Sequence, residues 1–452
     1  MSKIPQFIIA APTSNSGKTT ITLGLLRALE NRGFATQPFK VGPDYIDPKF
    51  HKVACGHVGV NLDLFMMSTD DIHQTYASFS KDKEAICIEG VMGLFDGAKK
   101  SEGSTAAVSK VLKLPIILVV DAKSVAYSVA PLLYGFKNFD PEIDIAGVIF
   151  NRVNTESHYQ FLKEACDDVG IPSFGYVPFI ADCEIPSRHL GLSIDEMDAY
   201  KPMISTMAIA IEKTVDVDQL LKKCTLERPV FKTKSSTKYI KKLRIGIAKD
   251  AAFNFSYVQN IKAFEALGEL VYFSPLEDSE IPEVDLLYFP GGYPEFYLKK
   301  IAANKTMRAA VLSFAKNGGR IIAECGGMMY LGSEILDEHG QAFEMCGVFP
   351  FKASMKNMKL ALGYRTIQLG DAILKGHEFH YSSVFEDEST RGIGKVFSAR
   401  SKEVRTKIYR TQNVWATYIH CYLGTVDGLS LVLKELGIDV VEDRKQEIGA
   451  RR

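Results

Sequence analysis

The sequence has no net charge, no long apolar segment and no regular spacing of cysteines. Its 54 basic and 54 acidic residues cancel, which excludes an overall field that would draw the chain to nucleic acid or an anionic membrane. The eight cysteines contain no CxxC pair, so we expect neither a disulfide framework nor a zinc site. The apolar run near the N-terminus spans only about six residues, too short for a signal peptide or a membrane span. We therefore expect a cytoplasmic protein.

Composition and length indicate a globular protein of more than one domain. Hydrophobic residues make up 46% and charged residues 24% of the 452 positions, as in ordinary soluble chains, and this length fits roughly two to three domains. The segment RPVFKTKSSTKYIKKL is basic, rich in Ser and Thr, and without apolar periodicity, which is typical of a linker. We predict a first domain at 1–225, a linker at 226–242, a second domain at 243–438 and a charged tail at 439–452.

Alternation of strand and helix patterns predicts a doubly wound α/β sheet in the first half and a second α/β domain after the linker. The apolar, β-branched runs are typical of buried parallel strands, and helical spacing follows at 19–32 and 157–169. The strands expected in the first half are 7–11, 85–89, 116–121, 145–151 and 175–178. Those expected in the second half are 243–248, 269–274, 286–289, 320–324 and 415–419.

A phosphate-binding loop is predicted where FIIAAPTSNSGKTTITLGLL passes from a strand through a turn into a helix. Backbone N–H groups and the helix N-terminus would face the phosphates, Lys18 would reach the outer phosphoryl oxygens, and Thr19 would bind Mg²⁺. The loop resembles that of dethiobiotin-synthetase-like enzymes, although Ala11 stands where they usually have glycine. The alternative is a Ser- and Gly-rich helix cap. The expected ATP-binding residues are Ser14, Asn15, Ser16, Gly17, Lys18, Thr19, Thr20 and Asn151.

Two carboxylates that follow separate strands are expected to complete the magnesium site. Asp44 lies in the loop VGPDYIDP, and Glu89 ends the strand in ICIEGVMGLFDG. The carboxyl ends of strands in an open α/β sheet form the usual ligand crevice, and Mg²⁺ takes one or two carboxylates beside phosphate oxygens. Each carboxylate alone could instead be a turn or cap residue. Asp121 either acts through water or caps the next element, and Asn151 either reads a purine or closes a buried turn.

A nucleophilic cysteine is predicted at Cys325 in IIAECGGMMYLG, where a strand, a tight turn and a helix follow one another. The helix N-terminus would lower the pKa of the thiol, and backbone N–H groups would receive an oxyanion. His420, which we expect at the end of a strand in VWATYIHCYLG, is the favoured base. Gly291, Gly292 and Gly326 are expected to shape the oxyanion loop and the glutamine pocket.

Two further histidines, His377 and His380 in GHEFHYS, are alternative bases, for which we favour structural or interface roles. A buried structural cysteine is the alternative reading of Cys325, and its flanking glycines argue against it because they permit a strained turn.

Taken in order, these motifs resemble the cobyrinic acid a,c-diamide synthase family of corrinoid biosynthesis over nearly the whole chain. The resemblance implies a P-loop dethiobiotin-synthetase-like domain followed by a class I glutamine amidotransferase-like domain. It also implies Mg²⁺ as cofactor, ATP and L-glutamine as co-substrates, and amidation of the a and c carboxylates of a cobalt-containing corrinoid through acyl-phosphate intermediates. The motifs are SGKTTITLGLL, KVGPDYIDP, EGVMGLFDG, RHLGLS, FPGGYPE, AECGGMMYL, LGYR, GHEFHYS and YIHCYLG.

The resemblance also assigns roles to individual residues. Cys325 corresponds to the glutaminase nucleophile and His420 to the residue that activates it. Asp44, Tyr45 and Asp47 correspond to a loop near the reacting carboxylate. Cys-Tyr follows His420 in place of the Pro-Glu of many triad glutaminases, which implies a Cys-His dyad.

Several alternatives stay open at this point. The same chemistry could act on hydrogenobyrinic acid or nickel sirohydrochlorin, or on other positions of the macrocycle as in cobyric acid synthase. A different class is a partner-switching P-loop ATPase with a degenerate glutaminase-like domain, which would hydrolyse ATP without glutaminase activity. We expect a small-molecule corrinoid partner, no nucleic acid and no membrane, and we leave open whether the chain forms a homodimer.

Overall fold

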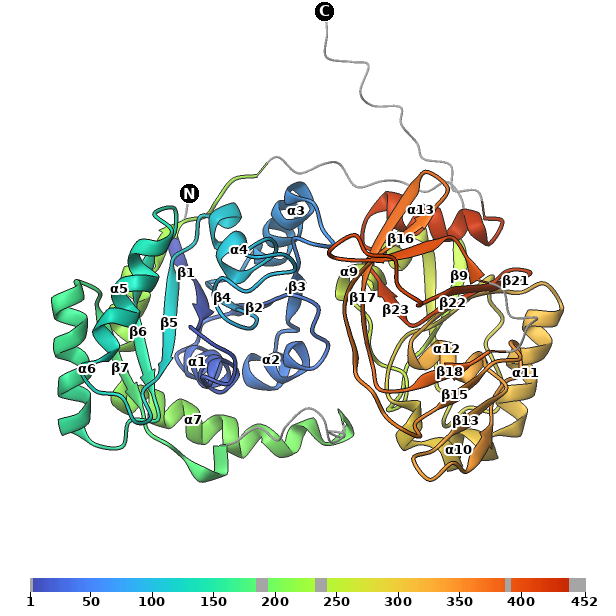
Figure 1. The fold of residues 1–452 in the computed structure, drawn as a ribbon, viewed down its shortest axis with the longest axis horizontal. Helices are drawn as coiled ribbons and strands as arrows, with labels where there is room; N and C mark the ends of the chain where they lie inside the picture. Colours follow the sequence, from blue (N-terminus) through green and yellow to red (C-terminus); the bar gives the residue numbers. More distant parts are fainter. Residues whose placement is uncertain (1–2, 184–193, 232–241, 387–391, 439–452) are drawn as a thin grey trace, which may run out of the picture. The chain divides into compact units, whose positions relative to one another are not determined.

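The computed structural model describes residues 3–183, 194–231, 242–386 and 392–438, and the chain divides into two compact units at 1–234 and 235–452 (Figure 1). The motif RHLGLS at 188–193 and the charged tail at 439–452 lie outside the described residues. Within the described part of the chain, every helix is too short or too polar to cross a membrane.

The first unit is built on a sheet in the order β3-β2-β4-β1-β5-β6-β7, in which all neighbours on this path are parallel. β8 adds an antiparallel pairing to the start of β1. The strands are β1 (Lys3–Ala10), β2 (Thr36–Val41), β3 (Val60–Leu62), β4 (Ala85–Glu89), β5 (Ile116–Asp121), β6 (Ile145–Asn151), β7 (Ser173–Val177) and β8 (Thr225–Glu227).

Helices cover this sheet because its central strands are apolar on both faces. Phe7 and Ile9 of β1 pack in one core cluster with apolar residues of α1, α2, α7 and α8. The helices are α1 (Lys18–Asn31), α2 (Asp47–Cys55), α3 (Thr69–Ser80), α4 (Thr105–Leu112), α5 (Val129–Phe139), α6 (Glu156–Val169), α7 (Lys201–Thr214) and α8 (Val217–Lys223). The predicted doubly wound α/β class is confirmed, and the strands expected at 85–89, 116–121 and 145–151 have these bounds in β4, β5 and β6.

The segment expected as a linker at 226–242 begins instead as part of the first unit. Leu226 and Glu227 lie in β8, opposite Ile4 and Lys3 of β1. Arg228 then donates Nη1 to the carbonyl of Ser80 at 2.7 Å. Short polar strands of this kind lack the apolar runs by which the other strands were found.

The second unit has a seven-stranded sheet in the order β10-β9-β11-β12-β22-β21-β19. Its parallel part contains β9 (Leu243–Ala248), β10 (Gly268–Phe273), β11 (Leu286–Phe289), β12 (Arg320–Glu324) and β22 (Val414–Thr417). β21 (Ile408–Thr411) and β19 (Gly392–Ile393) extend the sheet in antiparallel fashion. The helices are α9 (Val258–Leu267), α10 (Leu298–Ala303), α11 (Lys305–Lys316), α12 (Gly326–Leu331) and α13 (Val426–Glu435).

Two smaller sheets complete the second unit, and the sequence did not reveal them. One has the order β14-β13-β15-β18 and the other β20-β16-β17-β23. They contain β13 (Glu334–Leu336), β14 (Ala342–Glu344), β15 (Lys352–Ser354), β16 (Ala361–Leu369), β17 (Ala372–His380), β18 (Ser383–Phe385), β20 (Lys395–Ser398) and β23 (Ile419–Cys421).

The strand predicted at 415–419 is interrupted. β22 ends at Thr417, and β23 pairs in antiparallel fashion with β17 rather than continuing in the central sheet. His420 therefore lies inside a short separate strand, opposite His377, and not at the end of a central strand.

Candidate active sites

The P-loop of the first unit is shaped by one glycine and one buried asparagine. Gly17 precedes α1 with φ of +91°, a left-handed conformation that favours glycine. Asn151, at the end of β6, donates Nδ2 to the carbonyl of Ser16 at 3.0 Å. A methyl group at Gly17 would lie 2.0 Å from this Nδ2 atom. Ser14 and Asn15 of this loop are exposed to solvent.

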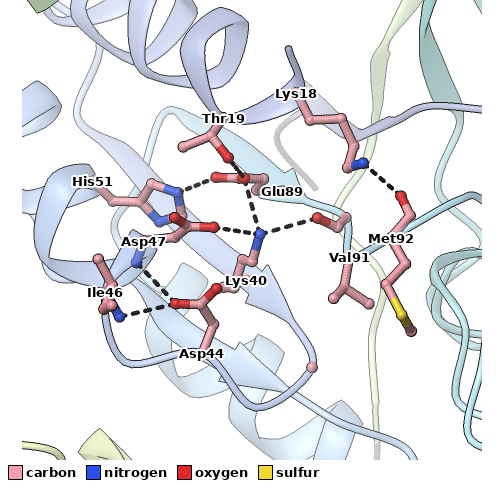
Figure 2. A network of polar contacts seen from close by, with 12 residues as sticks. Lys18, Thr19, Lys40, Asp44, Ile46, Asp47, His51, Glu89, Val91 and Met92 are labelled. Carbon is pink, nitrogen blue, oxygen red and sulfur yellow. Dashed lines mark hydrogen bonds and ion pairs between the residues drawn. The ribbon is translucent and has the colours of Figure 1, made fainter. Parts of the chain in front are cut away.

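Lys18 and Thr19 lie at the start of α1 (Figure 2). Thr19 contacts the end of β4, and Lys18 contacts the loop that follows β4. Lys18 donates Nζ to the carbonyl of Met92 at 2.5 Å and to that of Thr13 at 3.4 Å. Thr19 donates its hydroxyl to Glu89 Oε1 at 2.6 Å. Thr20 is half-buried on the same turn. An ammonium group, a hydroxyl and a carboxylate therefore converge beside the loop.

Glu89 is the centre of a buried network of charged groups (Figure 2). Lys40 Nζ lies 2.9 Å from Glu89 Oε1 and 2.6 Å from Asp47 Oδ2. His51 Nε2 lies 2.7 Å from Glu89 Oε2. Lys40 and His51 are 3% and 0% exposed, so these contacts are shielded from solvent.

The protonation of Glu89 follows from this network. Burial alone would raise the pKa of its carboxyl, but the charge of Lys40 and the hydrogen bonds from His51 and Thr19 outweigh burial. The pKa of Glu89 is thereby held well below its ordinary range. The carboxylate is charged at neutral pH, as a ligand for a cation must be.

The loop between β2 and α2 carries the other two predicted carboxylates. Asp44 Oδ1 accepts the backbone N–H groups of Ile46 at 2.9 Å and Asp47 at 3.0 Å, which stabilises the turn into α2. Asp47 pairs with Lys40. Tyr45, which directly follows Asp44, is half-buried. The structure thus brings Glu89 to Thr19, whereas Asp44 serves at least as a turn residue, one of the alternatives that its sequence context left open.

Asp121 and Asn151 end the neighbouring strands β5 and β6. Asp121 accepts the N–H of Lys123 at 3.0 Å and pairs with Arg152 Nη1 at 2.6 Å, which agrees with the capping role. Asn151 Oδ1 accepts the N–H of Arg152 at 3.0 Å. Since both polar atoms of the Asn151 side chain are engaged, its contact with a purine stays a prediction.

Cys325 of the second unit forms the strained turn expected of a nucleophile elbow. It lies between β12 and α12 with φ of +48° and ψ of −109°, unusual for a residue other than glycine. Its N–H donates to Thr417 O at 2.8 Å, and its thiol contacts Phe379 O at 3.8 Å. A methyl group at Gly326 would lie 2.9 Å from Gly292 O. The elbow and the Gly291–Gly292 turn are therefore in close contact.

His420 lies against the same turn. A methyl group at Gly291 would come within 2.1 Å of His420 Cε1, so only glycine leaves room for the imidazole. The structure thus brings His420 and the Cys325 elbow to the same turn, and His420 lies inside β23 rather than at the strand end expected from the sequence. Their catalytic roles remain predictions.

The prediction that the pKa of the Cys325 thiol is lowered is wrong for this structure. Burial raises the pKa of Cys325 well above its ordinary value of 9.0, and the nearby Glu295 raises it further. α12 has only six residues, so its N-terminus offsets little of this effect. Burial, together with the charges of His377 and His380, lowers the pKa of His420 to about 3. The thiol and the imidazole are both neutral at pH 7.

His380 has the structural role that we favoured. Its Nε2 lies 2.9 Å from Glu378 Oε1, and its ring stacks on Tyr418 with centroids 3.7 Å apart. Glu378 also accepts hydrogen bonds from Arg365 Nε at 2.5 Å and from Thr406 at 2.9 Å. These contacts support the Phe379 carbonyl, which faces the Cys325 thiol.

The sequence reading missed Lys40, His51 and Glu295 as site residues. Lys40 lies in the motif KVGPDYIDP, in which the sequence indicated only the residues of the loop as site residues. The residues around His51 form no motif that would indicate a site. Glu295 follows the Gly291–Gly292 turn in PGGYPE. Its Oε2 atom is buried without a hydrogen bond from any described residue, and burial raises the pKa of this carboxyl to about 7.

Comparisons with known proteins identify the two domains. Residues 7–192 match the CobQ/CobB/MinD/ParA nucleotide binding domain, and residues 244–427 match the CobB/CobQ-like glutamine amidotransferase domain. A cobyrinate a,c-diamide synthase of Listeria innocua is 39% identical over 92% of this chain and 96% of its own. One from Picrophilus torridus is 39% identical over 93% of this chain and 96% of its own.

A relative from Brucella abortus carries a different substrate in its name. It is a hydrogenobyrinate a,c-diamide synthase, 37% identical over 92% of this chain and 97% of its own. Matches of this extent cover both units, so the whole chain, and not one domain, is shared with these enzymes. The protein is thus a glutamine-dependent amide ligase with a nucleotide-binding domain, and it belongs to the cobyrinate a,c-diamide synthase family.

Proposed function

We propose that this protein amidates the a and c carboxylates of cobyrinate, with ATP to activate each carboxylate and glutamine as the source of ammonia. The observation that carries the proposal is the presence in one chain of a P-loop with a Thr19–Glu89 pair and a Cys325 elbow packed on a Gly-Gly turn. The names of the Listeria and Picrophilus relatives support the choice of substrate.

The first unit would transfer a phosphoryl group to the substrate carboxylate. A carboxylate oxygen is a poor leaving group until it is phosphorylated, and the loop backbone with Lys18 would hold the phosphates for transfer. Lys18 would exchange its carbonyl partners for phosphate oxygens. Asp44, Tyr45 and Asp47 would line the loop near the reacting carboxylate.

Magnesium fits the residues beside this loop. The Thr19 hydroxyl and the Glu89 carboxylate, 2.6 Å apart, are oxygen ligands of the kind that Mg²⁺ prefers. When bound there with ATP, Mg²⁺ would neutralise charge on the phosphates. Lys40 and His51 would keep Glu89 ionised and oriented. We place Asp44 in the outer part of the same site.

The second unit would release ammonia from glutamine. The Cys325 thiol would pass its proton to His420 as the sulfur bonds to the side-chain amide carbon. Backbone N–H groups around Gly292 and Gly326 would receive the developing oxyanion. His420 would return the proton to the departing nitrogen as the C–N bond breaks, and water would hydrolyse the thioester. Glu295, with its buried oxygen, would bind the α-ammonium group of glutamine.

The substrate alternatives remain distinct proposals. Because of the name of the Brucella relative, hydrogenobyrinate is the first alternative substrate to test. Nickel sirohydrochlorin and amidation at other positions of the macrocycle would be tested next. A partner-switching ATPase would require a degenerate second unit, and the Cys325 elbow argues against it. We also propose a homodimer, which light scattering in solution would test.

The test is to incubate the protein with cobyrinate, ATP, Mg²⁺ and glutamine and to follow the product mass. Wild type should convert two carboxylates to amides. Cys325→Ser should lose this activity with glutamine and regain it with ammonium. Glutaminase turnover without any change in cobyrinate would remove this substrate, and the same assay with hydrogenobyrinate would follow. Absence of glutaminase activity with every acceptor would overturn the amidotransferase assignment.

A further inference from the structure

The segment that carries His420 leaves the central sheet where the nucleophile elbow begins. β12 and β22 end together, with Glu324 opposite Thr417, and β23 then pairs with β17. Tyr422 donates its N–H to a carbonyl of β17 at 2.9 Å. Since neighbouring peptide groups of an antiparallel strand point in opposite directions, the N–H of Cys421 points away from β17.

Side chains, rather than another strand, hold this outer edge of β23. Glu324 Oε1 accepts the N–H of Cys421 at 3.0 Å. Asn260, on α9, donates Nδ2 to Cys421 O at 2.8 Å and accepts the N–H of Leu423 at 2.8 Å. Glu324 and Asn260 are 1% and 0% exposed. Two buried polar side chains therefore fix the backbone that follows the base.

Glu324 is also the residue directly before the nucleophile. Its second oxygen, Oε2, accepts the hydroxyl of Tyr288 at 2.9 Å, and Tyr288 is buried on β11. Both oxygens of the carboxyl are thus engaged, which fixes its orientation. The hydrogen bond from Cys421 to Glu324 joins the neighbour of His420 to the neighbour of Cys325.

We propose that Glu324 is a positioning residue for glutamine hydrolysis, which sets the place of His420 relative to Cys325 through its hydrogen bond to Cys421. The inference rests on the proposed roles of Cys325 and His420. Without this acceptor, the buried N–H of Cys421 would have no partner, and β23 would shift to find one. A displacement of about 1 Å between reacting groups lowers the rate on the order of 100-fold.

The test compares two substitutions at Glu324 in the full chain. Glu324→Leu removes the acceptor at similar size, and it should lower kcat for glutamine hydrolysis on the order of 100-fold while KM for glutamine changes less than about threefold. Glu324→Gln keeps an oxygen for Cys421 and should stay within about threefold of wild type. Ammonium-dependent amidation should be unchanged in both, which a general folding defect would not permit.

Ile322→Val is the matched control, because Ile322 is buried on the same strand and takes no part in these hydrogen bonds. It should keep the glutaminase kcat. If Glu324→Leu does not fold, Glu324→Met decides, since it also removes the acceptor for the Cys421 N–H with a flexible side chain of similar length. A fall in its kcat supports the proposal, and an unchanged kcat overturns it.

Two other results would overturn the inference. One is a folded Glu324→Leu protein with the wild-type kcat. The other is a Glu324→Gln protein as slow as Glu324→Leu, which would mean that the charge of Glu324 matters and not its hydrogen bond. A wild-type protein without glutaminase activity would instead refute the proposed function on which this inference rests.

Discussion

Thr19 Oγ1 and Glu89 Oε1 are joined by a hydrogen bond of 2.6 Å, although 70 positions separate the two residues in the chain. The sheet explains the contact, because β1 and β4 are neighbours with Ile9 opposite Glu89. The helix that follows β1 therefore begins beside the carboxyl end of β4. Parallel strand order thus brings a P-loop hydroxyl and a carboxylate together at one edge.

Thr19→Val should lower ATP-dependent amidation on the order of 100-fold, because it keeps the side-chain shape but removes the oxygen proposed to bind Mg²⁺. Thr19→Ser retains the hydroxyl and should stay within about threefold of wild type. Initial rates at several Mg²⁺ concentrations measure the difference. Equal activity of the Val and Ser variants would show that Thr19 binds no metal.

Glu89→Gln should destabilise the first unit by about 3 kcal/mol at pH 7, because it removes one charge from a buried ion-pair network. The folded-state pKa of Glu89 lies below its ordinary value of 4.5. Its contribution is therefore fully present above pH 4.5 and is lost as the pH falls through the folded-state pKa. The stability gap between wild type and Glu89→Gln should shrink below pH 4.5.

Urea denaturation of both proteins at pH 7 and pH 4 measures this gap. The matched control is Glu142→Gln, since the Glu142 side chain is 74% exposed and lies 3.4 Å from Lys110; little change is expected there. A gap that widens on acidification would contradict the ionised state of Glu89 in the folded protein.

Gly17→Ala should weaken ATP binding at least about tenfold, since alanine resists a φ of +91° and its methyl group would lie 2.0 Å from Asn151 Nδ2. Asn151→Ala alone loses one hydrogen bond, worth about 1 kcal/mol or roughly fivefold in affinity. The double variant should bind ATP better than Gly17→Ala, because the clash is gone and only the backbone strain remains.

Calorimetric titration with ATP gives these affinities, and Gly135→Ala serves as the control because a methyl group there would meet no atom within 4 Å. Wild-type affinity in Gly17→Ala would show that the P-loop tolerates a different backbone conformation from the one seen.

The fold and most of the site could be predicted because their signals are local. Apolar runs gave β4, β5 and β6 their observed bounds, and the glycines beside Cys325 and Lys18 mark tight turns. The role of Lys40 was missed because it depends on Asp47 and Glu89, which only the folded sheet brings to it. The break between β22 and β23 was also missed. WATYI at 415–419 has the pattern of a single strand, and the change of sheet within it depends on the distant strand β17.

Alkylation of Cys325 by iodoacetamide should accelerate roughly tenfold per pH unit up to pH 9, without a plateau. The reason is that burial raises the pKa of the Cys325 thiol and lowers that of His420 to about 3. A neutral thiol and a neutral imidazole form no preassembled ion pair. Mass spectrometry of the Cys325 peptide at each pH measures the rate. A plateau between pH 5 and pH 8 would reveal a thiolate–imidazolium pair and contradict the prediction.

Gly291→Ala should abolish glutamine hydrolysis while it leaves ammonium-dependent amidation intact. The added methyl group would lie 2.1 Å from His420 Cε1, so the imidazole must leave its observed position, and a shift of about 1 Å costs on the order of 100-fold in rate. Gly392→Ala is the matched control in the same unit, because the atoms nearest its added methyl group would belong to the flexible Lys407 side chain, at 3.2 Å. Parallel assays with glutamine and ammonium separate the two activities. Equal losses with both nitrogen sources would mean that the substitution disrupts the fold, whereas full glutaminase activity would show that His420 need not occupy its observed position.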